Sequence, residues 1–470
     1  MADVHRVEEK TFEFEVPVVI VGAGAAGLVA ALAAREAGAD VLVIERDSVP
    51  RGSTALSAGL IPAPGTRFQK AAGIEDSPGL FARDILAKAH DEPDGDQVAL
   101  VTREIGPAIE WLADNHGLAF SVIDDFTYPG HSARRMHGLP QRSGEELIDA
   151  LRQAAEAAGI EILCDAHVTD LWADATGRVL GLGLVRPDGS TDEVGCGELI
   201  LACNGYGGNK ALVAEHVPSL SDALYFGHEG NQGDAILWGE ALGAASRHLG
   251  GHQGHGSVAH PAGILISWAT VTEGGFQVNL NGERFSNEAK GYSEQAAEVL
   301  RQPEGLAYTV FDERIAGIVR QFEDFRRAEA MGIILTADTP EALAERMNVP
   351  SGMLAETFAE VSRLKAEGAR DGFGREFSGV ADLAAPYHAV RVTGALFHTQ
   401  GGLVVDDAAR VLTRDGAVLP NLYATGGAAC GVSGKDASGY LSGNGLLTAV
   451  ALGRLAGQAA GRRVAVLASA

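Results

Sequence analysis

The sequence is poor in cysteine, in basic residues relative to acidic ones, and in long apolar runs. Its four cysteines, Cys164, Cys196, Cys203 and Cys430, form no Cys-x-x-Cys pair, which favours reduced, partly buried thiols over a metal site. Lysine and arginine number 37 against 62 aspartates and glutamates, a formal charge of -25, so phosphate backbones and anionic membranes are poor partners. No stretch is apolar over the length of a bilayer span, and the first residues lack the apolar core of a secretion signal. We therefore expect a cytoplasmic protein with no metal, no nucleic-acid partner and no membrane insertion.

What the sequence does contain is a glycine-rich unit at residues 17–46, PVVIVGAGAAGLVAALAAREAGADVLVIER. An apolar run leads into Gly22, Gly24 and Gly27, an Ala/Leu-rich helical stretch follows, and a second apolar run ends at Glu45. In such a strand–turn–helix–strand unit the glycines permit a tight turn, close approach to a pyrophosphate and close helix packing. The acid at the end of the second strand accepts hydrogen bonds from a ribose. The unit predicts a bound dinucleotide.

The 470 residues are enough for two domains. Residues 77–116 are mostly helical in pattern with a break near Pro93, residues 161–204 are rich in strands, and the turn at 186–190 is a hairpin signal. The composition changes at 256–385, where strand-like runs precede helices around 340–367; a last helix begins near Asn444. We predict an N-terminal extension (1–15), a first domain (16–255 and 386–470) and an inserted second domain (256–385).

Three further motifs stand in a fixed order after the N-terminal glycines: AsnGlyGluArgPheSerAsnGlu (281–288), HisThrGlnGlyGly (398–402) and AsnLeuTyrAlaThrGlyGly (421–427). With them the chain resembles, over nearly its whole length, the flavoprotein superfamily of fumarate reductase and succinate dehydrogenase. The resemblance implies an α/β fold in which a Rossmann-like FAD-binding domain is interrupted by an inserted α+β capping domain. Substrate is then held between the two domains, against the flavin.

The cofactor that the resemblance implies is FAD. The family's early loop carries a histidine where its flavin is covalent, but here residues 51–54 read ArgGlySerThr, so we expect non-covalent FAD. At Gly427 the family usually has an acid that reaches the ribitol, so this one contact is in question. The residues expected at FAD are Gly22, Gly24, Ala25, Ala26, Gly27, Glu45, Arg46, Gly52, Ser53, Thr54, Ala58, Gly59, Val168, Ala202, Gly205, Gly208, Asn209, Gly426, Gly427, Ser442 and Leu446.

The positions that hold substrate in soluble fumarate reductases are only half matched. His260, in HisPro, and His398, in HisThrGlnGlyGly, match the family's two histidines. The two arginines are replaced: Tyr292 stands eight residues after Arg284, and Tyr440 stands just before the last helix. Tyrosines at these two positions resemble the 3-ketosteroid dehydrogenases, flavoproteins that desaturate the carbon pair beside a ketone.

The chemistry of such a desaturation fits these residues. It needs a base at the α-carbon, a hydride acceptor at the β-carbon and donors on the carbonyl oxygen. We expect Tyr292 to be the base, although an ordinary tyrosine has a pKa of about 10 and needs neighbours that stabilise its phenolate. Tyr440 and the backbone N–H near Gly445 would hold the oxygen, and His398 would support a tyrosine or the substrate. From the loop before residue 143, Tyr128 and Arg134 are further candidates for substrate binding.

Three functions remain open. The first is an FAD-dependent dehydrogenase that introduces a double bond α,β to the carbonyl of a cyclic ketone, either a cyclohexanone bearing a carboxylate or a 3-ketosteroid. The second is a reductase or dehydrogenase of small unsaturated di- or tricarboxylic acids, for which Arg134, Arg135 and Arg391 remain available beside the two histidines. The third is an FAD-binding carrier without turnover. For the enzymes, a diffusible electron acceptor, oxygen or a quinone, is expected.

Overall fold

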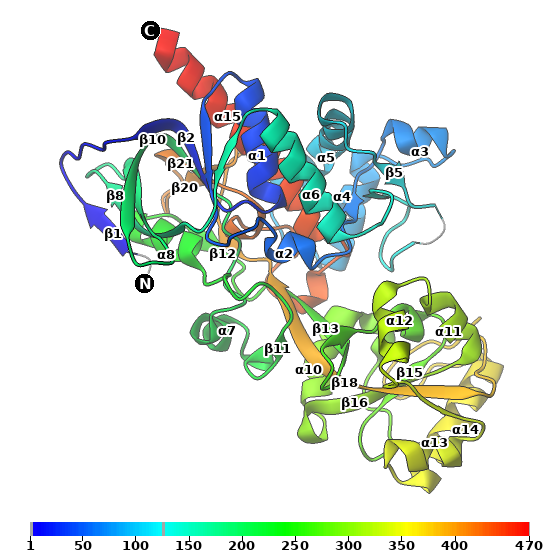
Figure 1. Ribbon diagram of the computed structural model, residues 1–470. Coiled ribbons are helices and arrows are strands. Elements are labelled where there is room, and N and C mark those ends of the chain that lie inside the picture. Colours follow the sequence, from blue (N-terminus) through cyan, green and yellow to red (C-terminus); the bar gives the residue numbers. More distant parts are fainter. Residues whose placement is uncertain (1–2, 125–126, 470) are drawn as a thin grey trace. The chain divides into compact units, whose positions relative to one another are not determined.

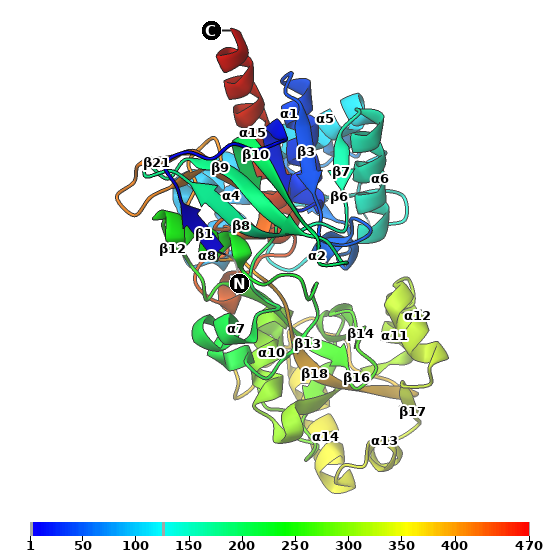
Figure 2. The ribbon, with the colours of Figure 1, turned by 60° about the vertical axis from the view of Figure 1, so that its left-hand side comes forward.

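The computed structural model describes residues 3–124 and 127–469, which fold into two compact units. The first unit contains the residues up to 216, residues 227–252 and the residues from 398 onward, and the second contains residues 217–226 and 253–397. Both units combine helices with a β-sheet, as Figures 1 and 2 show. The chain is therefore an α/β protein, as the sequence predicts.

The first unit is built on its largest sheet, with the strand order β1-β8-β9-β10-β2-β3-β7 and with β21 paired to β10 and to β20. Its elements are β1 (Asp3–Arg6), β2 (Glu15–Val21), α1 (Ala25–Glu36), β3 (Val41–Ile44), α2 (Gly52–Ala55), β4 (Ile61–Pro62), α3 (Arg67–Ala71), α4 (Pro78–Lys88), α5 (Gly95–His116), β5 (Ser121–Val122), β6 (Met136–Gly138), α6 (Gly144–Ala157), β7 (Glu161–Leu163), β8 (His167–Ala173), β9 (Val179–Val185), β10 (Thr191–Leu201), α7 (Lys210–His216), α8 (Asp234–Leu242), β12 (Ser246–Arg247), β19 (Gly402–Leu403), β20 (Arg410–Leu412), β21 (Val418–Ala424) and α15 (Asn444–Ser469).

The centre of this sheet is parallel. Strand β2 pairs in parallel with β3 on one side and with β10 on the other, and β10 pairs in parallel with β21. Residues Val18–Ile20 are fully buried, as expected of a parallel strand covered on both faces. The strand–turn–helix–strand unit predicted at 17–46 is confirmed, and so is the hairpin at 186–190, which joins β9 to β10 in antiparallel pairing.

Helix α15 packs along α1 through three glycines spaced by four residues. A Cβ added at Gly453, Gly457 or Gly461 would lie 2.7, 2.1 or 2.8 Å from the carbonyl oxygens of Ala26, Ala30 and Ala34 respectively. The residue numbers of the three glycines and of the three alanines increase in the same direction, so the two helices are parallel. Their N-terminal ends therefore point toward the same end of the unit, and Asn444 begins α15 nine residues before Gly453, a rise of about 13 Å.

The second unit is built on a sheet of order β14-β13-β18-β16-β15, in which β11 and β17 also pair with β18. The long strand β18 pairs antiparallel with β16 over seven consecutive positions from Leu306 to Asp312. The elements are β11 (Leu224–Tyr225), β13 (His252–Ala259), β14 (Ile264–Leu265), α9 (Ala269–Thr272), β15 (Phe276–Val278), α10 (Tyr292–Leu300), β16 (Leu306–Asp312), α11 (Glu313–Val319), α12 (Glu323–Ala330), β17 (Leu335–Ala337), α13 (Pro340–Met347), α14 (Ser351–Glu367) and β18 (Tyr387–Thr399).

The units differ from the predicted domains at three places. The second unit extends to residue 397 rather than 385, because β18 pairs with β16 and β17. It also takes in residues 217–226, because β11 pairs with β18. The segment predicted as an N-terminal extension contributes β1, which pairs in parallel with β8, and β2 already begins at Glu15.

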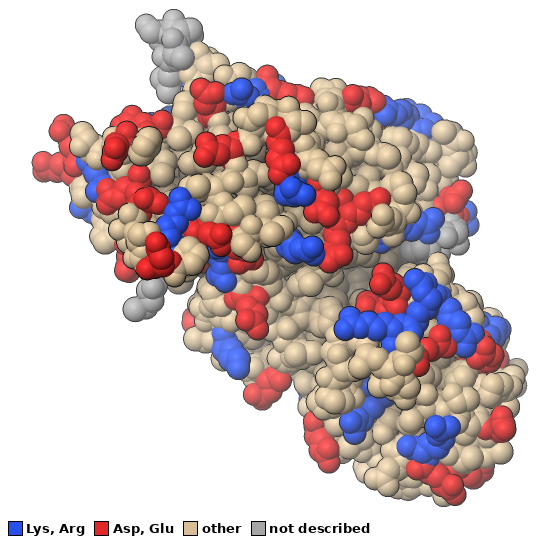
Figure 3. Space-filling view, viewed as in Figure 1, with Lys and Arg blue, Asp and Glu red and all other residues tan. Residues whose placement is uncertain are grey.

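The surface carries charges of both signs. On the face drawn in Figure 3, acidic and basic side chains are interspersed among neutral ones. Among the residues that the structure describes, no helix combines the length and the apolar character needed to cross a membrane.

Candidate active site and cofactor site

The turn after β2 has the geometry that a dinucleotide requires. Gly22 has a φ of +104°, and a Cβ there would lie 2.6 Å from the carbonyl oxygen of Ala202. A Cβ at Gly27 would lie 1.9 Å from the carbonyl oxygen of Gly22, so this glycine lets α1 pack against the turn. At Gly24 the nearest atom is the Thr54 hydroxyl, 3.6 Å away. The backbone at Gly24 is thus open to a pyrophosphate at the start of α1, where the first N–H, that of Ala25, donates to the Thr54 hydroxyl at 3.0 Å.

Glu45 follows β3 and is held by the same turn. Its carboxylate accepts hydrogen bonds from the backbone N–H groups of Ala23, at 2.8 Å, and Asp47, at 3.0 Å. Each carboxylate oxygen keeps a second lone pair, so the fixed carboxylate suits two ribose hydroxyl donors. These residues fit the adenosine half of FAD.

Two asparagines that the sequence analysis did not select bond to Ser53 of α2. The side-chain amides of Asn204 and Asn231 donate to the Ser53 hydroxyl, at 3.1 and 2.8 Å. A Cβ at Gly427 would lie 2.1 Å from the Asn204 side-chain oxygen. Glycine at position 427 therefore makes room for the Asn204 amide. The signal for Asn204 in the sequence is the AsnGly pair after a strand, whereas Asn231 lies in the stretch GlyAsnGlnGly at 230–233.

Several glycines expected at FAD lie so close to other parts of the protein that a larger residue would not fit. A Cβ at Gly59 would lie 2.3 Å from the Ser143 carbonyl oxygen, one at Gly205 2.0 Å from the Thr399 hydroxyl, and one at Gly208 2.6 Å from the Glu229 carbonyl oxygen. Gly426, with a φ of +60°, lies against Ala26 of α1. Close chain packing alone accounts for glycine at these positions, so they are weaker markers of the cofactor than Gly24.

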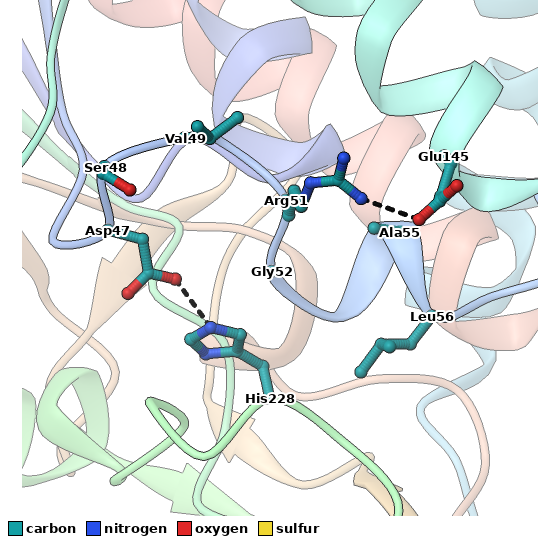
Figure 4. Close-up of a pocket in the computed structure, with 9 residues that line it drawn as sticks. All are labelled: Asp47, Ser48, Val49, Arg51, Gly52, Ala55, Leu56, Glu145 and His228. Carbon is teal, nitrogen blue, oxygen red and sulfur yellow. Dashed lines mark hydrogen bonds and ion pairs between the residues drawn. The ribbon is translucent and has the colours of Figure 1, made fainter.

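A pocket of about 390 Å³ lies along the loop after Glu45 (Figure 4). Two polar contacts border it: His228 Nε2 lies 2.6 Å from Asp47, and Arg51 forms an ion pair with Glu145 at 2.7 Å. The lining residues are Asp47, Ser48, Val49, Arg51, Gly52, Ala55, Leu56, Glu145 and His228. Because the lining includes Gly52 and adjoins Ser53, the pocket belongs to the expected cofactor region of the first unit.

The start of α15 gathers the candidates of the first unit. The rings of His398 and Tyr440 meet edge to face, with centroids 5.5 Å apart. A Cβ at Gly445 would lie 3.1 Å from the His398 Cε1 atom, so the imidazole lies directly over the first turn of the helix. Burial lowers the pKa of His398 to about 4, which makes the ring neutral near pH 7. The structure thus brings together His398, Tyr440 and Gly445, and their roles toward a substrate stay predictions.

Tyr440 and Tyr128 are suited to donate a hydrogen bond. Burial raises the pKa of Tyr440 above its ordinary value, and the neighbouring Tyr128 raises it further. Burial raises the pKa of Tyr128 to about 12, where its ring packs against Leu60, Ile123 and Met136. Both phenols remain protonated at neutral pH, so each can donate to a substrate oxygen.

Tyr292, at the first position of α10, lies in an aromatic group of the second unit. Its ring stacks on His255 with centroids 4.9 Å apart, and His255 stacks in turn on Phe397 at 5.4 Å. Trp268 meets both His255 and Tyr292 edge to face. Burial lowers the pKa of His255 to about 3, so Tyr292 faces a neutral imidazole.

The histidine beside Tyr292 is His255, which the sequence analysis missed, and not His260. His260 is exposed and follows the end of β13, five residues beyond His255 and so about 16 Å further along the strand. The signal for His255 is its flanking glycines. A Cβ at Gly254 or at Gly256 would lie 2.7 Å from atoms of α10, so both glycines let α10 pack onto β13 and set Tyr292 over the imidazole.

Of the three arginines proposed for an acid substrate, two are exposed and one is buried in ion pairs. Arg134 and Arg391 are exposed. Arg135 is fully buried and pairs with Asp76 and Asp84, at 2.9 and 2.5 Å. The role of Arg134 in substrate binding therefore stays a prediction.

Arg284, eight residues before Tyr292, is likewise buried in ion pairs. It pairs with Glu288 at 2.6 Å and with Asp371 at 2.5 Å, and Arg375 also pairs with Glu288, at 3.2 Å. These pairs hold the segment before α10 in place.

Comparison with known proteins gives the family. Residues 17–446 match the family model described as FAD binding domain. The chain belongs to this family. It is 29% identical over 449 residues to a probable fumarate reductase, Ifc3, of Shewanella frigidimarina, covering 95% of this chain and 74% of that protein.

Two further similar proteins are dehydrogenases whose names contain a ketone. The chain is 25% identical over 556 residues to a 4-oxocyclohexanecarboxylate 2-dehydrogenase of Sinomonas cyclohexanicum, covering 94% of this chain and 93% of that protein. The solved structure of a 3-ketosteroid-Δ4-(5α)-dehydrogenase from Rhodococcus jostii RHA1 is similar with a TM-score of 0.76 and 26% identity, covering 96% of this chain and 98% of that one. The chain is thus an FAD-dependent oxidoreductase that acts on CH–CH groups.

Proposed function

We propose that this chain is a dehydrogenase that introduces a carbon–carbon double bond α,β to the carbonyl of a cyclic ketone. The observation that carries the proposal is the setting of Tyr292 and Tyr440. Each stands where the fumarate reductases have a substrate-binding arginine, and each lies against a neutral histidine. A dicarboxylate is normally held by bidentate arginines, whereas a neutral carbonyl needs only donors.

The proposed roles follow from the protonation of these groups. FAD, when bound, supplies the hydride acceptor. Tyr440, kept protonated by burial, donates to the carbonyl oxygen together with the N–H of Gly445, and so stabilises the enolate that develops when the α-carbon loses its proton. Tyr292, in its phenolate form, takes that proton and becomes a neutral phenol. Stacking on His255 fixes the direction of its phenol oxygen, which is the positioning that proton transfer requires.

The substrate proposed first is a cyclohexanone that carries a carboxylate, with a 3-ketosteroid as the second. The similarity over 94% of the chain to a 4-oxocyclohexanecarboxylate dehydrogenase supports the smaller ring. We also propose that FAD is non-covalent, because the loop at 51–54 carries no histidine, and that oxygen or a quinone accepts the electrons.

A second candidate, a reductase of small unsaturated acids, is favoured by the 29% identity to a probable fumarate reductase. An anaerobic absorbance assay separates the two. Oxidised protein is mixed with saturated cyclic ketones and with saturated acids, and dithionite-reduced protein with an enone and with fumarate. We expect flavin bleaching by cyclic ketones and reoxidation by the enone. Response to the acids alone would support the second candidate, and no response to any compound would indicate a carrier.

A further inference from the structure

A chain of buried polar side chains ends on His398. The Gln400 side-chain nitrogen lies 3.1 Å from His398 Nδ1, the Ser433 hydroxyl donates to the Gln400 side-chain oxygen at 2.8 Å, and the Asn444 side-chain amide donates to the Ser433 hydroxyl at 2.9 Å. Gln400, Ser433 and Asn444 are 5%, 1% and 0% exposed. Within the first unit, therefore, a hydrogen-bonded row connects the first residue of α15 to the imidazole.

The hydrogen bonds of this row can run in either of two directions, depending on how the side-chain amides of Gln400 and Asn444 are oriented. In the observed arrangement the Gln400 NH₂ group donates to His398 Nδ1, so this nitrogen carries a lone pair and the proton sits on Nε2. In the reverse arrangement Nδ1 would donate to the oxygen of a turned Gln400 amide. For the Ser433 hydroxyl to keep an acceptor for its proton within the row, Asn444 would have to turn as well, and its NH₂ group would lose its hydrogen bond to Ser433.

The burial of Asn444 favours the first direction. Among the described residues, the Asn444 side-chain oxygen has no hydrogen-bond partner. If the amide were turned, an NH₂ group would occupy that place. A buried carbonyl oxygen without a partner is tolerated more often than a buried N–H without one. The competing acceptor for Nδ1, the Thr399 carbonyl oxygen, lies further away, at 3.4 Å.

The proton on Nε2 then stands at the start of α15. A Cβ at Gly445 would lie 3.3 Å from this nitrogen, and the Tyr440 ring meets the imidazole from the side. We propose that Gln400, Ser433 and Asn444 are positioning residues that hold His398 in the tautomer protonated at Nε2, as a donor to the substrate oxygen beside Tyr440. The choice of acceptor rests on the proposed function, whereas the tautomer does not.

The tautomer is measured directly by ¹⁵N NMR of the FAD-loaded, full-length protein with labelled histidine. The His398 signals are assigned by their loss in His398→Asn. We expect a protonated Nε2 and an unprotonated Nδ1 in the wild type. In Gln400→Glu the carboxylate can only accept, so the proton should move to Nδ1. A wild-type ring protonated at Nδ1, or an unchanged tautomer in Gln400→Glu, would overturn the proposal.

Kinetic measurements test separately whether His398, protonated at Nε2, acts as a donor to the substrate. Gln400→Glu and Ser433→Ala should slow anaerobic flavin reduction by a cyclic ketone about 10- to 1,000-fold, with little change in the affinity for FAD. The control is Thr448→Val, which removes a buried hydroxyl bonded to the Asn444 carbonyl oxygen but leaves the row intact, and which should keep the wild-type tautomer and rate. If the tautomer shifts in Gln400→Glu while the rate does not fall, the donor role is wrong. If no ketone reduces the wild-type flavin, the proposed function fails and the tautomer stands.

Discussion

His255 stacks on Tyr292 with ring centroids 4.9 Å apart and planes 23° from parallel. The contact exists because two glycines of β13 let α10 approach the strand, so backbone packing aims the side chain proposed as the base. A stacked ring restrains the rotation of Tyr292 without adding charge. The second unit therefore presents a phenol of fixed direction, and the buried pairs of Arg284 hold the segment that precedes it.

The first prediction concerns the space that Gly427 leaves to Asn204. In Gly427→Ala the new methyl group would lie 2.1 Å from the Asn204 side-chain oxygen, so the amide must leave Ser53. We expect the Kd for FAD, measured by titrating apoprotein, to rise about tenfold, or ~1.4 kcal/mol. Gly317→Ala, where a Cβ meets nothing within 4 Å, should bind FAD normally. Unchanged affinity in Gly427→Ala would show that Asn204 has no part in holding the cofactor.

The second prediction concerns the packing of α15 on α1. In Gly457→Ala the methyl group would lie 2.1 Å from the Ala30 carbonyl oxygen, and the backbone of α1 cannot rotate away as a side chain can. Such overpacking costs about 1–3 kcal/mol, which should lower the urea midpoint of unfolding. The control, Gly352→Ala in α14, meets nothing within 4 Å and should leave stability equal or higher. Equal midpoints for the two variants would contradict the close approach of the helices.

Acid should destabilise the protein through its buried histidines. Burial lowers the pKa of His131, His137 and His398 to about 4 and that of His255 to about 3, while an unfolded histidine titrates near 6.5. Below pH 6.5 the unfolded chain therefore binds protons that the folded chain does not. The free energy of unfolding should fall as the pH drops from about 6.5 to about 4, by up to ~1.4 kcal/mol per pH unit for each histidine.

The measurement for this effect is urea unfolding between pH 7 and pH 4. His255→Phe keeps an aromatic ring in the stack but cannot bind a proton, so its stability should depend less steeply on pH than that of the wild type. A slope equal to that of the wild type would mean that His255 is protonated in the folded protein.

Much of the fold follows from local sequence. The apolar run before Gly22 and the acid after β3 predict the parallel core, and the break near Pro93 separates α4 from α5 as expected. The boundaries of the units were harder to predict from the sequence, because they depend on pairing between strands that are far apart along the chain. The ends of the second unit were misplaced because β11 and β18, more than 150 residues apart, pair with each other, and no local pattern records that pairing.

The site was predicted in part for the same reason. His398, Tyr440 and Gly445 come from neighbouring stretches of the last 75 residues, and their motifs sufficed to group them. His255 was missed because the sequence offers several histidines near β13, and only the packing of α10 selects one. The row from Asn444 to Gln400 was missed because serine, asparagine and glutamine are common, and their alignment is a property of tertiary structure.

The central claim is that Tyr292 removes the α-proton of a cyclic ketone. It is tested most directly by anaerobic stopped-flow reduction of the bound flavin by 4-oxocyclohexanecarboxylate. Tyr292→Phe, which keeps the stacked ring, should slow reduction about 100- to 10,000-fold with its FAD content unchanged. Tyr308→Phe, which removes a buried phenol bonded to the Met347 carbonyl oxygen, should reduce at the wild-type rate. Reduction of Tyr292→Phe at the wild-type rate, or wild-type flavin that bleaches only with saturated acids, would contradict the account.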